Sequence, residues 1–138
     1  MLNTHQLEEL LLSPRPLERY WATHLTASST SWETIYTQHP HLAFLLAQNP
    51  HIPVGLADQL ADHSNPKVRL MVARHPQLSQ SSLERLAQDD EAAIRLQIAK
   101  RDDLPPYLIE WLEQDPDSAI HTALLRYQQP RLQQVVDF

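Results

Sequence analysis

Apolar residues recur along this chain three or four positions apart, in short runs separated by polar segments. Val68 and Val72 stand four apart, and Leu83 and Leu86 stand three apart. This spacing places apolar side chains on one face of a helix, whereas a half-buried strand needs strict alternation, which no stretch sustains. The pattern therefore predicts an all-α protein.

The same apolar pattern returns every 26 residues. The aligned columns include Leu42/Val68/Ile94/Ile120, Leu46/Val72/Ile98/Leu124, Ala47/Ala73/Ala99/Leu125, Ile52/Leu78/Leu104, Ala57/Leu83/Ile109 and Leu60/Leu86/Leu112. One further copy precedes them at a spacing of 25 residues, with Leu17, Trp21, Ala22, Trp32 and Ile35. We expect Trp21 and Trp32 to be core residues, and the alanine column to mark the closest approach of the helices.

Each copy predicts a short first helix and a longer second helix. Pro50 and Pro76 follow the first run so closely that only about two turns fit before the chain must break. This short element fits either an α-helix or a 3₁₀ turn. The second helix begins near Ser81 in one copy and near Pro105–Pro106 in the next, and it ends at a polar corner loop.

One such unit is too small to bury its apolar face, so successive copies must stack and share a core. The prediction is a superhelical α-solenoid of about 25- to 26-residue two-helix repeats, forming a single domain over 1–138. We expect repeats over 17–128, an N-terminal capping helix within 1–16 and a C-terminal capping helix within 129–138. The apolar positions of the two caps are Leu7, Leu10 and Leu11, and Leu132, Val135 and Val136.

The segments SNPKVRLMVARHPQLSQSSLERLA and DDEAAIRLQIAKRDDLPPYLIEWLE resemble the leucine-rich repeat variant family, a relative of HEAT-like helical repeats. The resemblance extends over about residues 17–128 and implies a curved superhelix in which short 3₁₀-like and longer α elements alternate in two layers. It implies no shared catalytic residues. A similar family member holds an iron–sulfur cluster through N-terminal cysteines. This chain has no cysteine, so we expect no cofactor.

Composition narrows the function classes further. A net charge of −6 disfavours nucleic acid as a partner, and a single glycine, Gly55, excludes glycine-rich phosphate-binding loops. No apolar run approaches the roughly 18 residues that a membrane span requires. The N-terminus MLNTHQLEELLLS carries acidic residues where a signal peptide carries basic ones, so we expect a cytoplasmic protein.

Two columns of cationic positions follow the 26-residue period. The first comprises Arg69, Arg95 and His121, and the second comprises Arg74, Lys100 and Arg126. Stacked copies align each column as a ladder, which suits a partner protein with an acidic patch. The alternative is that the arginines pair with aspartates of the corner loops, such as Asp62, Asp89 or Asp115.

Trp111 is a further candidate for partner binding, because its column is otherwise polar: Thr34, Gln59 and Arg85. An exposed indole there can anchor a partner. The alternative is that it packs under the C-terminal segment ending in Phe138.

An acidic column of Asp58, Glu84 and Glu110 is expected to face solvent, and its even spacing gives no convergent acid and base. His39, His41 and His51 cluster in the sequence, and His24 or His63 could complete a zinc site with them. They share no helix face, so we predict exposed loop histidines and no metal site.

These observations predict a non-catalytic protein–protein interaction module. The sequence does not choose between an adaptor or scaffold and an immunity protein that occludes a toxin, nor does it define the oligomeric state. The alternative is a nucleic-acid-binding protein, because HEAT-like solenoids resembling the alkylpurine DNA glycosylases grip DNA with basic concave faces.

Overall fold

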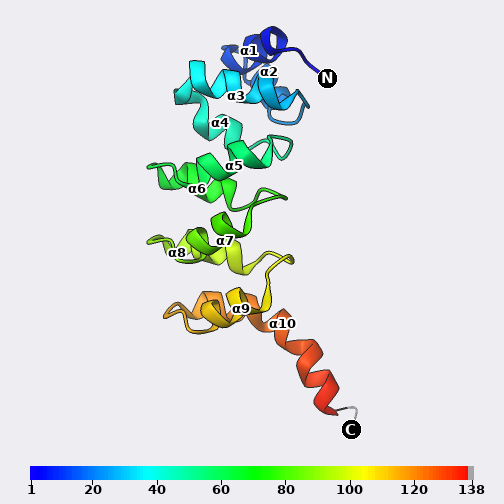
Figure 1. Cartoon of the computed structure of the whole chain (residues 1–138), viewed down its shortest axis with the longest axis vertical. Coiled ribbons are helices and arrows are strands. Elements are labelled where there is room, and N and C mark those ends of the chain that lie inside the picture. Colours follow the sequence, from blue (N-terminus) through cyan, green and yellow to red (C-terminus); the bar gives the residue numbers. More distant parts are fainter. Residues whose placement is uncertain (137–138) are drawn as a thin grey trace.

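The chain is described by a computed structural model that covers the backbone of residues 1–136 and the side chains of residues 1–127. Its helices are α1 (Thr4–Leu12), α2 (Pro16–Ala22), α3 (Ser29–Gln38), the 3₁₀ helix η1 (Pro40–Leu42), α4 (Ala43–Ala47), α5 (Val54–Ala61), α6 (Pro66–Val72), α7 (Gln80–Ala87), α8 (Ala92–Ala99), α9 (Pro106–Glu113) and α10 (Ser118–Val136). They lie one above another along the long axis, with the two termini at opposite ends (Figure 1).

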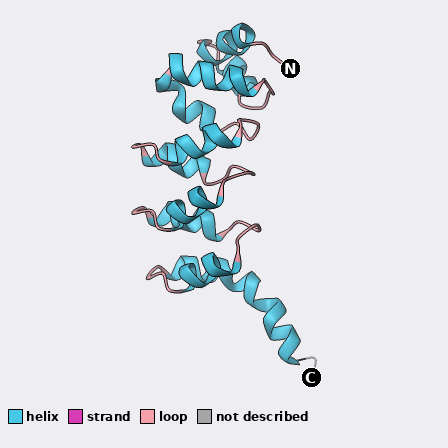
Figure 2. Ribbon diagram, in the orientation of Figure 1, coloured by secondary structure: helices cyan, strands magenta, loops and turns pink. Residues whose placement is uncertain are grey.

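The described residues form helices and connecting loops, with no strand (Figure 2). The only sheet-like contact in this part of the chain is an isolated parallel bridge between Leu2 and Ala27. The all-α prediction is therefore confirmed. Among the described residues, no helix has the length and apolar character needed to cross a bilayer.

Equivalent helices begin at equivalent positions. The second helices of three successive pairs, α5, α7 and α9, begin at Val54, Gln80 and Pro106, and each has eight residues. Local signals set these starts. The Ser79 side chain accepts a hydrogen bond from the amide of Ser82 at the start of α7, and Pro106 stands at the first position of α9.

The short first helices are α-helical. In α6, the Asn65 side chain caps the amide of Lys67, and the amide of Ala73 donates to the carbonyl of Arg69 four residues earlier. Only Pro40–Leu42, just before α4, is a 3₁₀ helix in the described part of the chain. The expectation of 3₁₀-like first elements is correct there and wrong for α6 and α8, because two turns suffice to close i to i−4 bonds before the proline.

The core consists of the predicted apolar columns. Val68, Val72, Ile94 and Ile98 are at most 1% exposed, and so are the leucines of the second helices, Leu60, Leu86 and Leu112. The alanine column of Ala22, Ala47, Ala73 and Ala99 is also buried. Small side chains there suit the packing of α6 against α4 on one side and against α8 on the other.

Three predicted core positions are exposed, and Leu17 of α2 is the most exposed of them, at 66%. Trp32 is fully buried as expected, but Trp21 is 52% exposed because α2 packs chiefly against α1 and turns this indole outward. Leu125 is also 52% exposed. It lies in α10, a single helix of 19 residues, and the described residues contain no second helix that follows α10 and covers this side chain.

Helix α1 covers the first layer, with Leu7 and Leu11 buried against α2 and α3. A capping box formed by Asn3 and Gln6 sets its start. The expected C-terminal cap within 129–138 depends on Leu132, Val135 and Val136, whose side chains lie outside the described residues. That part of the predicted organisation stays a prediction.

The two tryptophans should differ sharply in their contribution to stability. Trp32→Ala should lower the free energy of unfolding by about 3 to 5 kcal/mol, because it leaves a large cavity in the core. Trp21→Ala should cost less than about 1 kcal/mol, because the exposed indole loses little packing. Urea denaturation of the wild type and both variants measures this, and equal losses would contradict the placement of Trp21.

Candidate functional site

Loops leave the helix stack on two opposite edges (Figure 1). We call one the corner edge, which carries the loops that lead from each second helix to the next first helix, at 62–65, 88–91 and 114–117. We call the other the return edge, which carries the loops that follow the first helices, at 48–53, 73–79 and 100–105. The candidate residues divide between these two edges.

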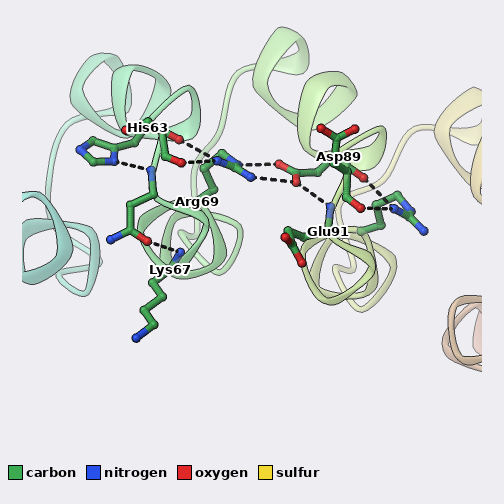
Figure 3. Close-up of polar contacts among 9 residues, drawn as sticks. His63, Lys67, Arg69, Asp89 and Glu91 are labelled. Carbon is green, nitrogen blue, oxygen red and sulfur yellow. Dashed lines mark hydrogen bonds and ion pairs between the residues drawn. The ribbon is translucent and has the colours of Figure 1, made fainter.

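Arg69 links two layers along the corner edge (Figure 3). Its Nε and Nη2 donate to the two carboxylate oxygens of Asp89, at 2.8 and 3.2 Å. Its Nη1 donates to the carbonyls of His63 and Ser64, at 2.9 and 3.2 Å. One guanidinium therefore holds the loop before its own helix and the corner loop of the next layer.

Arg95 repeats this arrangement one layer on. Its Nε and Nη2 donate to Asp115 at 2.8 and 3.4 Å, and its Nη1 donates to the carbonyls of Asp89 and Asp90 at 2.7 and 3.3 Å. The carboxylates of Asp89 and Asp115 are each 8% exposed. Such bidentate, half-buried pairs are the strong kind of ion pair.

The pKa values reflect this pairing. The hydrogen bond to Asp89 raises the pKa of Arg69 above its ordinary value, against the effect of burial. Burial disfavours the charged form of Asp115, but hydrogen bonds from Arg95 and from the amide of Asp117 outweigh it and lower its pKa. Both groups therefore stay charged in the folded protein near neutral pH.

The donors of Arg69 and Arg95 are thus engaged within the chain, which is the alternative that the sequence left open. His121, the third member of this column, is exposed on α10. It has no hydrogen bond or ion pair among the described residues. The first cationic column therefore ties layers together and leaves little of its charge available to a partner.

A second interlayer column lies on the return edge, and sequence reasoning missed it. Its members are Asn49, His75, Arg101 and Tyr127, each 26 residues from the next. Each side chain forms a hydrogen bond with a carbonyl of the preceding layer. Arg101 is typical, since its Nη1 donates to the carbonyls of Ala73 and His75 at 2.9 and 2.6 Å.

Asn49 and Tyr127 make the same kind of contact. The Asn49 amide donates to the carbonyls of Ala22 and Leu25, at 2.9 and 3.0 Å, and the Tyr127 hydroxyl donates to the carbonyl of Arg101. These bonds satisfy carbonyls near helix C-termini that have no partner inside the helix. The signal in the sequence was an unbroken polar column two residues after the buried alanine column.

His75 is the buried histidine of this column, at 4% exposure. Its Nε2 lies 3.1 Å from the carbonyl oxygen of Ile52, and its Nδ1 lies 2.6 Å from the carbonyl oxygen and 3.1 Å from the amide nitrogen of Gln77. The two carbonyls can accept hydrogen bonds from the ring, whereas the Gln77 amide can donate only to an unprotonated Nδ1. Burial lowers the pKa of His75, and it outweighs the carbonyls of Gln77 and Ile52, which act in the opposite direction.

Arg74 and Lys100 remain available on the return edge. Both are exposed, and neither has a hydrogen bond or ion pair among the described residues. They line one hollow of about 510 Å³, together with Gln97 and the loop residues around His75 and Arg101. Two cations without partners therefore face the same space, at the ends of successive first helices.

Arg126, the third member of this column, is occupied. Its Nη2 donates to the carbonyls of Ala99 and Arg101, and its Nε donates to Asp102 at 3.2 Å. The second carboxylate at the hollow, Asp103, pairs with Arg101, whose hydrogen bond lowers the pKa of that carboxyl. The positive charge of Arg74 and Lys100 is therefore not neutralised by either carboxylate.

Half-buried apolar side chains lie on the first helices α4, α6 and α8. They are Leu45 of α4, Leu70 and Met71 of α6, and Leu96 of α8. Phe44 of α4 is 42% exposed, and Met71 lines a smaller hollow of about 250 Å³ together with Arg74. The exposed face of the first helices thus combines an apolar stripe with two cations.

The acidic column of Asp58, Glu84 and Glu110 was expected to face solvent, and this expectation is wrong for its first two members. Asp58 accepts hydrogen bonds from the amide and hydroxyl of Ser79 and from the hydroxyl of Ser82, at 3.2, 3.0 and 2.6 Å. Glu84 accepts from the Tyr107 hydroxyl of the next layer at 2.6 Å. Only Glu110 is exposed and has no such contact in the described part of the chain.

Trp111 lines a hollow on the corner edge that shares no lining residue with the hollow of Arg74 and Lys100. It is 45% exposed, and its ring meets that of Tyr107 edge-on at 5.5 Å. Phe138, proposed as its cover, lies outside the described residues. The structure therefore places Trp111 near Arg95 and does not bring it together with the return-edge cations.

The histidines do not converge. His39 pairs with Glu8 at 2.7 Å, and its ring meets that of His41 edge-on at 5.8 Å. Among the described residues, no group of three or more His, Cys, Asp or Glu side chains is placed to hold a metal ion.

The comparisons with known proteins identify one segment. Residues 66–91, which extend from the start of α6 to the end of the following corner loop, match the family described as Leucine rich repeat variant. The resemblance seen in the sequence is thereby confirmed for this segment. No curated protein and no solved structure matches the chain.

The corner-edge pairs should contribute to stability in a way that exposed cations do not. Arg69→Ala should lower the free energy of unfolding by about 2 to 3 kcal/mol, because Asp89 stays largely buried without its cation. Lys67→Ala is the matched control on the same helix, and it should change stability by less than about 0.5 kcal/mol. Urea denaturation measures both, and a small loss for Arg69→Ala would refute a structural role.

His75 should make stability depend on pH. Its pKa in the folded protein lies below the ordinary 6.5, so its stabilising effect is complete above that pH and is lost as the pH falls below it. His75→Asn, which copies position 49, should reduce the fall in melting temperature between about pH 7.5 and pH 5.5. His51→Asn, on an exposed loop, should not, and equal pH slopes for the three proteins would exclude this role.

Proposed function

We propose that this chain, whose residues 66–91 match the leucine-rich repeat variant family, is a superhelical α-solenoid of 25- to 26-residue repeats that binds another protein without catalysis. Repeats of this family are associated with protein–protein interaction in helical-repeat proteins. The observation that carries the proposal is the pair of partnerless cations, Arg74 and Lys100, which line one hollow at the ends of first helices that carry half-buried apolar side chains.

The packing of the layers supports the first helices as the inner side of the solenoid. Helix α6 contacts α4 and α8 more extensively than α7 contacts α5 and α9. In a curved stack, layers approach most closely on the concave side, which is the surface that helical-repeat proteins use for binding. Arg74 and Lys100 follow the first helices, so they border this inner surface.

The proposed partner is a protein segment with apolar and acidic side chains. Half-buried Met71 of α6 and Leu96 of α8 offer an apolar contact. Arg74 and Lys100, at the ends of these helices, favour carboxylates in the partner. Desolvation of the apolar stripe would contribute affinity, while the cations would determine orientation and association rate. Both an adaptor and an immunity protein fit this chemistry, because each occupies a partner's surface.

Nucleic acid is the second candidate, favoured only by the basic hollow. The net charge of −6 and the engagement of Arg69, Arg95, Arg101 and Arg126 within the chain leave few cations for phosphates. Binding to duplex DNA in a salt titration would support this class instead, since phosphate contacts weaken steeply as salt rises.

Charge reversal tests the inner surface. Arg74→Glu/Lys100→Glu should remove the partner proteins that the wild-type chain captures from its source cells, with a loss of at least about tenfold in affinity for a purified partner. The fold should persist, because exposed charges contribute little to stability. Capture followed by mass spectrometry and titration calorimetry measures these effects.

The matched control is Arg19→Glu/Lys67→Glu. Both residues are exposed and have no side-chain partner among the described residues, and the double variant changes the net charge by the same amount. It should keep the partner. If both double variants bind equally well, or if Arg74→Glu/Lys100→Glu unfolds the protein, the hollow is not the binding surface.

A further inference from the structure

A second hollow lies on the corner edge, away from the proposed inner surface. It has a volume of about 520 Å³ and is lined by the loops 87–90 and 114–116, the Arg95–Asp115 pair and the exposed indole of Trp111. Because Arg95 is paired with Asp115 and Asp89 is paired with Arg69, the described residues of the hollow offer an aromatic ring, the unpaired carboxylate of Asp90 and no available cation.

The preceding layer contains the same hollow in another form. Nine of the residues around it stand 26 positions before residues that line the hollow of Trp111: Ala61, Asp62, His63, Ser64, Arg69, Arg85, Gln88, Asp89 and Asp90. In this earlier copy, the Arg85 guanidinium donates to the Asp62 carboxylate across the hollow. The chain thus fills one corner hollow with its own arginine.

The later copy lacks this ion pair. Trp111 stands where the earlier layer has Arg85, and Gln88 stands where it has Asp62. The later hollow is also larger, about 520 Å³ against about 330 Å³. The later hollow therefore has room for a side chain from outside the chain that the earlier hollow lacks.

The groups at the open hollow suit a planar cation. The Asp90 carboxylate is exposed and has no hydrogen bond or ion pair among the described residues. Trp111 is 45% exposed and lines the hollow, so a guanidinium that enters there can stack on its indole. The net charge of −6 attracts a basic segment at long range.

We propose that this corner hollow binds an arginine side chain from a basic segment of a partner protein. The guanidinium stacks on Trp111 and pairs with the carboxylate of Asp90. The site is distinct from the inner surface, because it lies on the opposite edge and selects the opposite charge. It adds a second point of attachment, and its test does not depend on Arg74 or Lys100.

The probe is a fluorescein-labelled peptide in which arginines alternate with glycines, titrated by fluorescence anisotropy at low salt. The reference peptide replaces each arginine by citrulline, which keeps the shape and removes the charge. The wild type should bind the arginine peptide roughly tenfold more tightly than the citrulline peptide. Trp111→Ala and Asp90→Asn should each weaken binding by about fivefold or more.

Two matched controls separate this site from general attraction to an acidic protein. Trp21→Ala removes another half-exposed indole, and Glu33→Gln removes one exposed carboxylate, as Asp90→Asn does. Both should bind the arginine peptide like the wild type. If either control weakens binding as much as its counterpart at the hollow, or if the citrulline peptide binds equally well, the assignment is overturned.

A second test fills the hollow with an ion pair of the chain's own. Gln88→Asp/Trp111→Arg rebuilds in this layer the pair that Asp62 and Arg85 form in the preceding one. The variant should keep the wild-type melting temperature and lose binding of the arginine peptide. If it still binds the peptide as the wild type does, the hollow is not the site.

Discussion

No helix pair of this protein can hold its shape alone, and every other feature depends on that constraint. The first helices α6 and α8 have seven and eight residues, which is too short for a stable isolated helix in water. Their stability therefore comes from burial between layers. Val68 and Val72 are covered only because α4 and α8 lie on either side of α6.

Polar side chains hold the two edges of the stack in different ways. On the corner edge, Arg69 and Arg95 reach aspartates of the following layer. On the return edge, Arg101 and its column reach carbonyls of the preceding layer. Each layer is therefore tied in both directions, and most arginines are used within the chain, whereas Arg74 and Lys100 keep their charge available at one shared hollow.

Successive copies of the repeat carry different side chains at a few equivalent positions, and these differences change the contacts made there. Asn49, His75 and Arg101 do the same structural task with different side chains, and only His75 makes that task sensitive to pH. Trp111 replaces a cation that closes the equivalent hollow one layer earlier. Two changed positions in one copy, Gln88 and Trp111, thus alter a corner hollow while the residues around them preserve the layer.

The sequence by itself determined the helical class, the register of the layers and most of the core. Apolar spacing reports which face of a helix is buried, and a fixed period reports which residues are equivalent, so columns such as Leu60, Leu86 and Leu112 could be predicted. It also named Arg74 and Lys100 as candidates. It misplaced Trp21, because α2 has a different neighbour from later first helices.

Only the tertiary structure decided which charges are free. Arg69 and Arg74 both belong to periodic cationic columns, and nothing in the period separates them. The acceptors available to such cations lie in the next layer or are backbone carbonyls. Whether a cation is paired therefore depends on the edge that its side chain reaches. Arg69 reaches the corner edge and meets Asp89, whereas Arg74 reaches the return edge, where Arg101 already holds the carbonyls and Asp103.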